Sequence, residues 1–540
     1  MPASRSRLTS RLGIIFFSMS LLVGIAGCAM HPAPTRPGTF TASGAEPDNP
    51  LIPADSTGND GIDIIDNLFA GLVYVDADGE VVPEAAESLT SEDHRHWHVR
   101  IRAGQSFSDG TPLTAESFVR AWKTSAKQGL KAVYPYAVIE GANADGTGEL
   151  NGLTVTGELT FDITLTEPIA SFPDRLVQNA FYPLPEAAYL PDGTIDPDFG
   201  FHPIGNGPYQ LAGEDAWIHN QSISLSASPR YTGPRKPRNK GFDLRFYTEA
   251  DAAYNDLLAD NVDVIDEIPA TARSTFKDEL EGRAVSRPVA QVVGIDIDAA
   301  QAPHFGYDAE GKLRRRAVSQ AIDRELIAHR IYFDTVSAAT DVLPPMIAGH
   351  GVTTPALSFD PEAARENWRR AEKISPFDGE ISLMYAADGG SRDLVEALCH
   401  QISQTLGVKA TPNPVPEFSA QMTAMRDHTI PTGFFRMSWS MGYPGADNIL
   451  SGRFIPGGGG HYNSYDSTAY TEAVSLARAS SGAEGVRAIG DAQAILLEDL
   501  PTIPLYYANV NGGWSRNVDN VRFTWNGNPA YWEVSLRNRG

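Results

Sequence analysis

Three histidines at alternating positions are the residues whose types and spacing most directly suggest chemistry. His94, His96 and His98 would project from one face of an extended strand, with about 7 Å between neighbours. Imidazole nitrogens bind nickel, copper or zinc, but metal–nitrogen distances of about 2 Å would require a bent strand or a further ligand. The apolar residues that alternate with them would bury the opposite face. We therefore interpret the histidines as a solvated face and keep a metal site as the alternative.

The sequence contains no recognisable catalytic centre. It has no G-x-S-x-G elbow, no H-E-x-x-H pair and no Walker-type phosphate loop. In the segment 205–208, a proline removes the backbone donor that a phosphate cradle would need. The acidic segment 76–80 lacks the spacing of a calcium loop and predicts a hairpin turn. Cys399 lies in a helix-like pattern that predicts a buried thiol, so we expect binding without catalysis and without a cofactor.

The N-terminus predicts export. Arg5, Arg7 and Arg11 precede an apolar stretch from Leu12 to Ala26, which is short for a membrane span and typical of a signal peptide. The following segment, Ile25-Ala26-Gly27-Cys28, resembles the bacterial lipobox, in which the cysteine sulfur receives a lipid. We expect a signal peptide at 1–27 and a Pro-rich tether at 28–37. The lipid on Cys28 would then hold the protein at the membrane.

Length and charge restrict the part of the chain beyond the tether. The chain has 540 residues, and so large a body predicts two or three lobes in place of one core. The formal net charge of −24 argues against nucleic acid as a partner, because phosphates require a basic surface. With Cys28 lipidated and Cys399 buried, no disulfide is expected.

Hydrophobic patterns predict a mixed α/β protein. Period-two alternation indicates strands, and wider apolar spacing indicates helices. We expect the helix at 114–122 to begin with Thr114 as N-cap and Ser117 at the third position, which is half of a capping box. The strands are predicted at 39–43, 96–101, 153–165 (a pair around a turn) and 381–385, and the helices at 114–122, 250–259, 313–331 and 391–406.

Four segments resemble the family 5 extracellular solute-binding proteins, which are the oligopeptide-, dipeptide- and nickel-binding components of ABC importers. The first contains F-S-D-G-T-P-L-T-A-E at 107–116, and the third resembles the family helix R-x-A-x-x-x-A-I-D-R. They occur in family order along most of the chain, and we interpret them as scaffold and not as ligand contacts. The segments are 97–116, 203–209 with 228–231, 313–324 and 499–506.

The resemblance implies a two-lobed fold of the type II periplasmic-binding-protein class, with an extra domain inserted in the first lobe. Ligand would be buried between the lobes by hinge closure, so that binding shifts the population towards the closed form. The implied parts are 38–69, 205–290 and 495–540 for the first lobe, 70–204 for the inserted domain and 291–494 for the second lobe.

The resemblance also implies a ligand-contacting loop at 437–448. Trp439 and Tyr443 align with aromatic residues of the family loop, and Asp447-Asn448 align with its final pair. Gly442 stands where peptide binders carry the aspartate for the ligand's α-ammonium group, and Gly445 replaces another acidic residue. A buried ammonium without a partner would cost several kcal/mol.

Other residues are therefore candidates for the ligand's charged ends. Glu46, Asp48 or Asp447 would replace the missing aspartate, unless the ligand carries no free amine. Arg392, at the start of the helix that follows strand 381–385, is the candidate for a ligand carboxylate, and a solvated surface arginine is the alternative. Tyr462, beside the glycine run 457–460, would lie over the mouth of the cleft; an ordinary exposed loop is the alternative.

Together these features predict a monomeric, lipid-anchored binding protein that captures short peptides and delivers them to the permease subunits of an ABC importer. The alternative is a protein of the same fold that binds a nickel or other metal chelate, a saccharide or an opine-like solute, because fold does not determine cargo.

Overall fold

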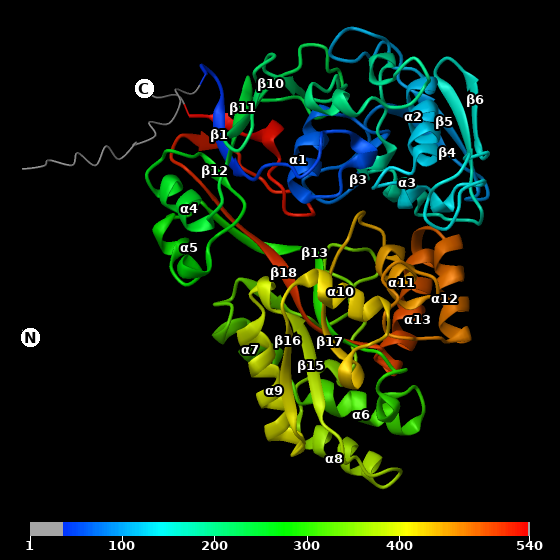
Figure 1. Cartoon of the computed structure of the whole chain (residues 1–540), viewed down its shortest axis with the longest axis vertical. Helices are drawn as coiled ribbons and strands as arrows, with labels where there is room; N and C mark the ends of the chain where they lie inside the picture. Colours follow the sequence, from blue (N-terminus) through cyan, green and yellow to red (C-terminus); the bar gives the residue numbers. More distant parts are fainter. Residues whose placement is uncertain (1–35, 538–540) are drawn as a thin grey trace, which may run out of the picture. The chain divides into compact units, whose positions relative to one another are not determined.

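The computed structural model describes residues 36–537. The predicted signal peptide and Cys28 lie outside the described residues. The central feature is a twelve-stranded mixed sheet whose main order is β16-β15-β17-β13-β18-β12-β1-β11-β10-β8 (Figure 1). Its strands are β1 (Phe40–Gly44), β8 (Tyr209–Leu211), β9 (Trp217–Ile218), β10 (Ser222–Ala227), β11 (Gly241–Phe246), β12 (Val264–Ile265), β13 (Ala284–Ile297), β14 (Val336–Ala338), β15 (Ile381–Ala386), β16 (Ala410–Val415), β17 (Phe434–Ser440) and β18 (Thr502–Trp514).

Two long antiparallel strands, β13 and β18, connect the two ends of this sheet. Near one end Ala284 pairs with Gly513, and near the other Asp296 pairs with Thr502. The pairing shifts register between Pro288 and Val292, and β13 then also pairs with β17. We call residues 36–287 and 510–537 the first lobe and residues 293–506 the second lobe, with the two strands crossing between them.

The sequence-predicted lobe boundary at 494/495 falls inside α13 (Gly482–Asp499). β18 still pairs with second-lobe residues at Thr502 and Ile503, and its Tyr507 lies opposite Val292. The second crossing therefore lies about a dozen residues further along the chain than the resemblance placed it, because the last helix must end before the return strand can begin.

Segment 70–204 of the first lobe contains a four-stranded antiparallel sheet covered by α2 (Ala115–Gln128). Buried Trp97, Val99 and Ile101 alternate with exposed residues in β5, as the sequence predicted. The predicted turn at 76–80 joins a short hairpin. The strands of this segment are β2 (Val73–Val75), β3 (Val81–Pro83), β4 (Ala86–Thr90), β5 (His96–Ile101), β6 (Leu153–Gly157) and β7 (Thr160–Thr164).

The remaining elements pack around the two ends of the main sheet (Figure 1). The predicted strand pair at 153–165 and the helices at 114–122, 250–259 and 391–406 are confirmed, with ends within a few residues of the prediction except that α2 continues to Gln128. The remaining helices and strands are α1 (Asn59–Leu68), α3 (Phe172–Arg175), α4 (Ala250–Leu258), α5 (Phe276–Glu279), α6 (Ala309–Gln320), α7 (Arg324–Arg330), α8 (Pro361–Glu372), α9 (Arg392–Leu406), α10 (Phe418–Arg426), α11 (Asp447–Phe454), α12 (Thr468–Ala479), β19 (Val518–Asp519) and β20 (Ser535–Leu536).

The prediction of one helix over 313–331 is wrong. The chain forms α6 and α7 with a break at 321–323, where the Asp323 side chain accepts a hydrogen bond from the backbone N–H of Leu326 at 2.9 Å. An aspartate in this role caps the start of a new helix and competes with continuation of the old one. The buried Arg324 then donates hydrogen bonds to backbone carbonyls, including that of Pro504.

The start of α2 is capped more fully than the sequence suggested. Ser117 Oγ accepts a hydrogen bond from the backbone N–H of Thr114 at 3.2 Å, so a serine completes the capping box that was predicted only in half. Among residues 36–537, no helix combines the length and the apolar character that crossing a bilayer demands.

Candidate functional site

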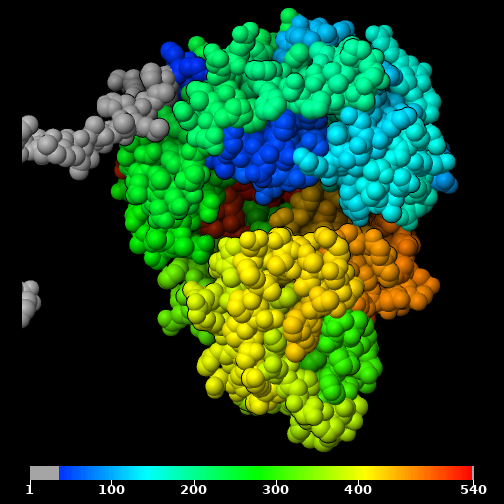
Figure 2. Space-filling model, in the orientation of Figure 1, coloured from blue at the N-terminus to red at the C-terminus, as the bar shows by residue number. Residues whose placement is uncertain are grey.

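A cleft lies where the first lobe, the second lobe and the crossing strand β13 meet. Its widest part is a cavity of about 330 Å³. Figure 2 shows a hollow between the blue surface that contains α1 and the yellow surface of the second lobe. The cavity is lined by Asn59, Ile62, Asp66, Val177, Gln178, Asn179, Val289, Ala290, Gln291, Ser440, Met441, Gly442, Asn526 and Asn528.

Three neighbouring cavities extend this space. One cavity of about 250 Å³ shares Gln291 with the widest part. Another, of about 240 Å³, shares Asp266 and Glu267 with the cavity of about 250 Å³. A smaller cavity of about 70 Å³ beside α1 shares Asp66 and Asn526 with the widest part. The shared walls show that these cavities adjoin one another along the cleft.

The helix α1 turns an acidic face towards this space. Asp60, Asp63 and Asp66 recur every three residues, so they lie along one side of the helix, and each lines one of the cavities. Asp63 accepts a hydrogen bond from Tyr531 Oη at 2.9 Å, and Asp66 accepts one from Tyr182 Oη at 2.8 Å. Burial raises the pKa of Asp66 to about 6 and raises the pKa of Asp63 well above its ordinary range.

Two more carboxylates follow β12. Asp266 and Glu267 form no ion pair with any residue of 36–537, and both line cavities. Asp266 opens on the cleft, but protein surrounds its other sides, and this desolvation, with a smaller contribution from Glu267, raises the pKa of Asp266 to about 6. Acidic side chains therefore outnumber basic ones on the first-lobe wall of the cleft.

Two guanidinium groups share a cavity with Asp266 and Glu267. Arg273 and Arg436 both line the cavity of about 250 Å³, and Arg273 lies 5.9 Å from the ring centre of Tyr332. Arg436 forms no ion pair within the described residues, and its buried Nε has no hydrogen-bond partner there. An arginine without a carboxylate partner is a suitable group for a ligand anion.

The sequence-predicted loop contributes Gly442 to the widest cavity. A Cβ at position 442 would lie 3.1 Å from Oε1 of Gln178, so the glycine faces the first lobe. Trp439 faces the opposite side of β17 from Ser438 and Ser440, because neighbouring strand residues alternate. Its Nε1 donates a hydrogen bond to Asn448 Oδ1 at 2.8 Å, and neither residue lines a cavity described above. Ligand contact by Trp439 or Asn448 stays a prediction.

Tyr443 and Asp447 lie in a closing contact between the lobes, which we define as these two residues with Ser171 and Arg175. Asp447 is buried, accepts hydrogen bonds from Ser171 and Tyr443 at 3.1 Å each, and pairs with Arg175. Burial alone would raise the pKa of Asp447, but the Arg175 charge outweighs it and the pKa is lowered. Through Ser171 and Arg175, the Asp447 carboxylate is bound to the first lobe.

Replacing Arg175 with alanine is expected to reduce the closed population of the ligand-free protein. In the open form both charges return to water, so we expect a shift of about 1 to 2 kcal/mol, or about 5- to 30-fold in the closing equilibrium. Small-angle X-ray scattering should show a larger radius of gyration for Arg175→Ala. Arg369→Ala, which removes an exposed arginine paired with Glu366, is the control. Equal scattering profiles for all three proteins would contradict the role of this contact.

The predicted replacements for the missing aspartate lie elsewhere. Both carboxylate oxygens of Glu46 already accept hydrogen bonds, from Trp217 Nε1 at 3.1 Å and from the backbone of Asn220 at 2.9 Å, and His219 pairs with it as well. Asp48 is exposed near the start of α1 and lines none of the cavities described above. Neither role in ligand binding is tested by these contacts.

The predicted carboxylate partner, Arg392, is exposed and pairs with Glu396 one helical turn away. Tyr462 is half-buried, and its hydroxyl donates a hydrogen bond to the carbonyl of Gly459 at 2.9 Å. Neither residue lines the cavities described above. Both assignments stay predictions.

The three histidines do not share a strand face. His94 precedes β5 with a left-handed φ of 58°, and its ring packs beside Trp97. His96 pairs with Asp93 and His98 pairs with Asp162, both on the exposed face. Within 36–537, no group of three or more histidine, cysteine or acidic side chains could hold a metal ion. The expected alignment of His94 with the other two is wrong, because the chain turns before the strand begins.

Several cleft residues were not singled out from the sequence. They include Asp63, Asp66, Asp266, Arg273 and Arg436. The spacing Asp60-x-x-Asp63-x-x-Asp66 was a readable signal, since apolar residues occupy the other side of the same helix. Nothing local to Arg273 or Arg436 distinguishes them from other arginines.

Known proteins share long stretches of this sequence. A family model described as "Bacterial extracellular solute-binding proteins, family 5 Middle" matches residues 80–461. The chain is 26% identical over 481 residues to YgiS of Escherichia coli, described as a probable deoxycholate-binding periplasmic protein, with 85% of each chain covered. It is 22% identical over 494 residues to the oligopeptide-binding protein OppA of Bacillus subtilis, covering 88% of this chain and 87% of the other.

Solved structures show the same fold. The murein tripeptide-binding protein MppA of Escherichia coli superimposes with a TM-score of 0.73 at 20% identity, covering 92% of this chain and 98% of the other. The predicted two-lobed α/β architecture is thereby confirmed.

Proposed function

The chain belongs to family 5 of the bacterial extracellular solute-binding proteins, and from this membership we propose that it captures short peptides between its lobes for an ABC importer. Such proteins bind solutes for transport and are not enzymes. Peptide as cargo draws support from relatives such as the oligopeptide-binding protein of Bacillus subtilis. Delivery to a permease, and anchoring through a lipid on Cys28, belong to the same proposal.

The observation that carries the proposal is that the cleft wall holds both acidic and basic side chains. Asp66 and its neighbours on α1 line one part, while Arg273 and the unpaired Arg436 line another part together with Asp266 and Glu267. A peptide presents an ammonium group and a carboxylate at its two ends, so it complements both. Residues 436–442 of the second lobe would span roughly 20 Å when extended, enough for a peptide of a few residues.

The intervening surface suits a ligand whose side chains vary. Gln291, Ser440, Asn526 and Asn528 offer both donors and acceptors to a peptide backbone. The cleft has more volume than the backbone of a short peptide fills. Water molecules can bridge between the peptide and polar groups of the cleft that a ligand side chain does not reach. Hinge motion about the crossing strands would complete contacts from both lobes.

The test is identification of the ligand by mass spectrometry after release from the purified protein, followed by a thermal-shift screen. Peptides of about two to nine residues are expected to raise the melting temperature. A ligand at about 100 times its Kd adds about 2.7 kcal/mol of stability. Deoxycholate, a nickel chelate and saccharides are the comparison ligands. A shift from one of these, with none from any peptide, would overturn the assignment of peptide as cargo.

A further inference from the structure

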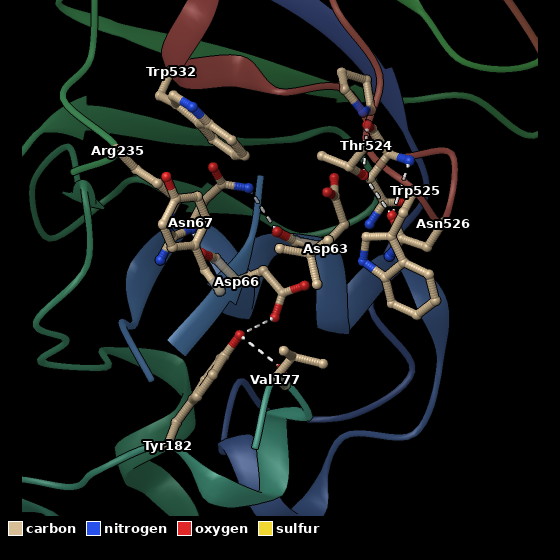
Figure 3. A pocket seen from close by; sticks show the side chains of 14 residues that line it. Asp63, Asp66, Asn67, Val177, Tyr182, Arg235, Thr524, Trp525, Asn526 and Trp532 are labelled. Atoms are coloured by element: carbon tan, nitrogen blue, oxygen red, sulfur yellow. Dashed lines mark hydrogen bonds between the residues drawn. The ribbon is translucent and has the colours of Figure 1, made fainter. Parts of the chain in front are cut away.

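The cavity of about 70 Å³ beside α1 has a distinct composition. We call it the α1 pocket and define it by Asp63, Asp66 and Asn67 on the helix with Trp525 and Trp532 opposite. Figure 3 shows the three α1 side chains together at the centre, with Trp532 on one side and Trp525 on another. Asp66, Val177, Asn526 and Asn528 line both the pocket and the widest cavity, so the two lie side by side.

Asn67 places an unused acceptor in this pocket. The residue is only 2% exposed, and its Nδ2 donates a hydrogen bond to the backbone carbonyl of Asp63 at 2.7 Å, which orients the amide. Its Oδ1 is buried and accepts no hydrogen bond within the described residues. Leaving a buried acceptor unsatisfied costs about 1 to 3 kcal/mol, so a donor from a ligand would be favourable at this position.

Two more acceptors accompany it. Asp63 and Asp66 each accept one hydrogen bond from a tyrosine through one oxygen, and the other oxygen of each accepts none from the described residues. With Asn67 Oδ1 this makes three oxygens without donors around one small cavity. A primary ammonium carries three N–H donors.

The nearby Arg235 does not satisfy these acceptors. Its guanidinium lies within a buried ion pair with Glu84 and donates to the carbonyls of Asp66 and Phe69. Its ion pair is with Glu84, and its charge lowers the pKa of Asp66 by less than burial raises it. No lysine, arginine or histidine of the described residues forms an ion pair with Asp63 or Asp66. Burial raises the pKa of both carboxyl groups, because removal from water disfavours their charged forms. A bound cation would favour the charged forms again.

Size and walls select the kind of cation. The pocket of about 70 Å³ is much smaller than the widest cavity of about 330 Å³, so it suits a small group of the ligand such as a methylene with its ammonium. The indole rings of Trp525 and Trp532 present aromatic surface, which attracts cations. The rest of the ligand would remain in the widest cavity.

We propose that the α1 pocket binds the primary ammonium group of the ligand and so replaces the aspartate that Gly442 lacks. The inference rests on the proposed peptide function. The ammonium is either the α-ammonium of the peptide or the side-chain ammonium of a lysine-like residue. Both present the same chemistry to the pocket.

Calorimetry on three variants tests this inference. Lys-Ala-Ala, which carries both an α-ammonium and a side-chain ammonium, should bind at least about 10-fold more weakly to Asp66→Asn and to Asn67→Leu than to the unmodified protein. Glu87→Gln removes an exposed carboxylate of the first lobe that lines none of the cavities described above, and should leave the affinity within about twofold. Thermal unfolding of each variant verifies that it is folded. Unchanged affinity of both pocket variants, while Lys-Ala-Ala still binds, overturns the inference and leaves the peptide function standing.

A second pair of ligands separates the two sources of ammonium. If the α-ammonium occupies the pocket, N-acetyl-tri-alanine binds poorly to the unmodified protein and gains nothing from a lysine. If a side-chain ammonium occupies it, N-acetyl-Lys-Ala-Ala binds well, and Asp66→Asn removes the gain. Either pattern supports the inference; a gain that Asp66→Asn leaves intact contradicts it.

The pocket can also be probed without any peptide. Titration with n-propylammonium should shift the indole N–H signals of Trp525 and Trp532 in nuclear magnetic resonance spectra, and propan-1-ol should not. Both shifts should disappear in Asp66→Asn. If these shifts occur while no peptide binds, the α1 pocket stands and the peptide assignment fails. If the ammonium and the alcohol give equal shifts, the inference is overturned.

Discussion

Replacing Arg436 with alanine is expected to weaken the binding of a peptide with a free carboxylate by about 30-fold or more. Arg436 lines the cleft, its Nε has no partner, and no ion pair within the described residues holds its charge. A ligand carboxylate in this partly desolvated position would form a charge-assisted, hydrogen-bonded pair. Removing one member of such a pair costs about 2 kcal/mol or more, which is about 30-fold in Kd.

The carboxylate itself can be removed in the same experiment. Tri-alanine amide should bind the unmodified protein as weakly as tri-alanine binds Arg436→Ala, and the variant should show little further loss with the amide. This non-additivity isolates the pair from a general disturbance of the cleft. Calorimetry on both ligands with both proteins gives the four affinities.

Arg392→Ala is the matched control, because Arg392 is exposed, pairs with Glu396 and was the sequence-predicted carboxylate partner. We expect its affinity for tri-alanine to be unchanged. If Arg392→Ala lost affinity for tri-alanine and Arg436→Ala did not, the ligand carboxylate would bind Arg392. This result would contradict its pairing with Arg436.

The sequence predicted those parts of the fold that depend on local pattern. The alternation of buried and exposed residues at 96–101 gives β5 because successive strand residues face opposite sides. The pair at 153–165 follows from the same rule around a turn. The prediction of one helix over 313–331 was wrong because it treated the apolar pattern as continuous across Asp323. The Asp323 side chain accepts a hydrogen bond from the backbone N–H of Leu326 and so caps the start of a new helix. The spacing of apolar residues alone does not reveal such a break between two helices.

The site was less predictable because its parts are distant in sequence. Tyr531 reaches Asp63 across 468 residues, and Arg175 reaches Asp447 across 272. Only the folded sheet brings these side chains together. The resemblance identified the loop that contains Gly442, but it could not show that Asp447 is committed to the closing contact, nor that the acidic face of α1 borders the same cavity as Gly442.

These placements give the glycine a physical meaning. Gly442 lies opposite Gln178, and an aspartate there would bring its Cβ within 3.1 Å of that side chain. Asp66 of the first lobe lines the same cavity as Gly442, and under the proposed function it would supply the carboxylate that the loop lacks. A substitution of one residue in the second lobe can thus be offset by charge on the facing wall.

The second large effect concerns the buried ion pair that supports α1. Glu84 and Arg235 are 1% and 4% exposed, and Arg235 Nε lies 2.6 Å from Glu84 Oε1. Arg235 also donates to the carbonyls of Asp66 and Phe69 at the end of α1. We expect Glu84→Ala to lower the free energy of unfolding by about 3 to 5 kcal/mol, because it leaves a buried guanidinium without its counter-charge.

Urea unfolding of the ligand-free protein measures this decrease in the free energy of unfolding. Two further variants serve as comparisons. Glu87→Ala removes an exposed glutamate from the neighbouring strand β4 and should change stability by less than about 0.5 kcal/mol. Glu84→Gln keeps the size and an acceptor oxygen but not the charge, so its loss should fall between the other two. If Glu84→Ala costs no more than Glu87→Ala, the pair does not hold α1 in place. If instead Glu84→Ala costs as much in a protein that lacks Arg235 as in one that has it, the two residues are not coupled.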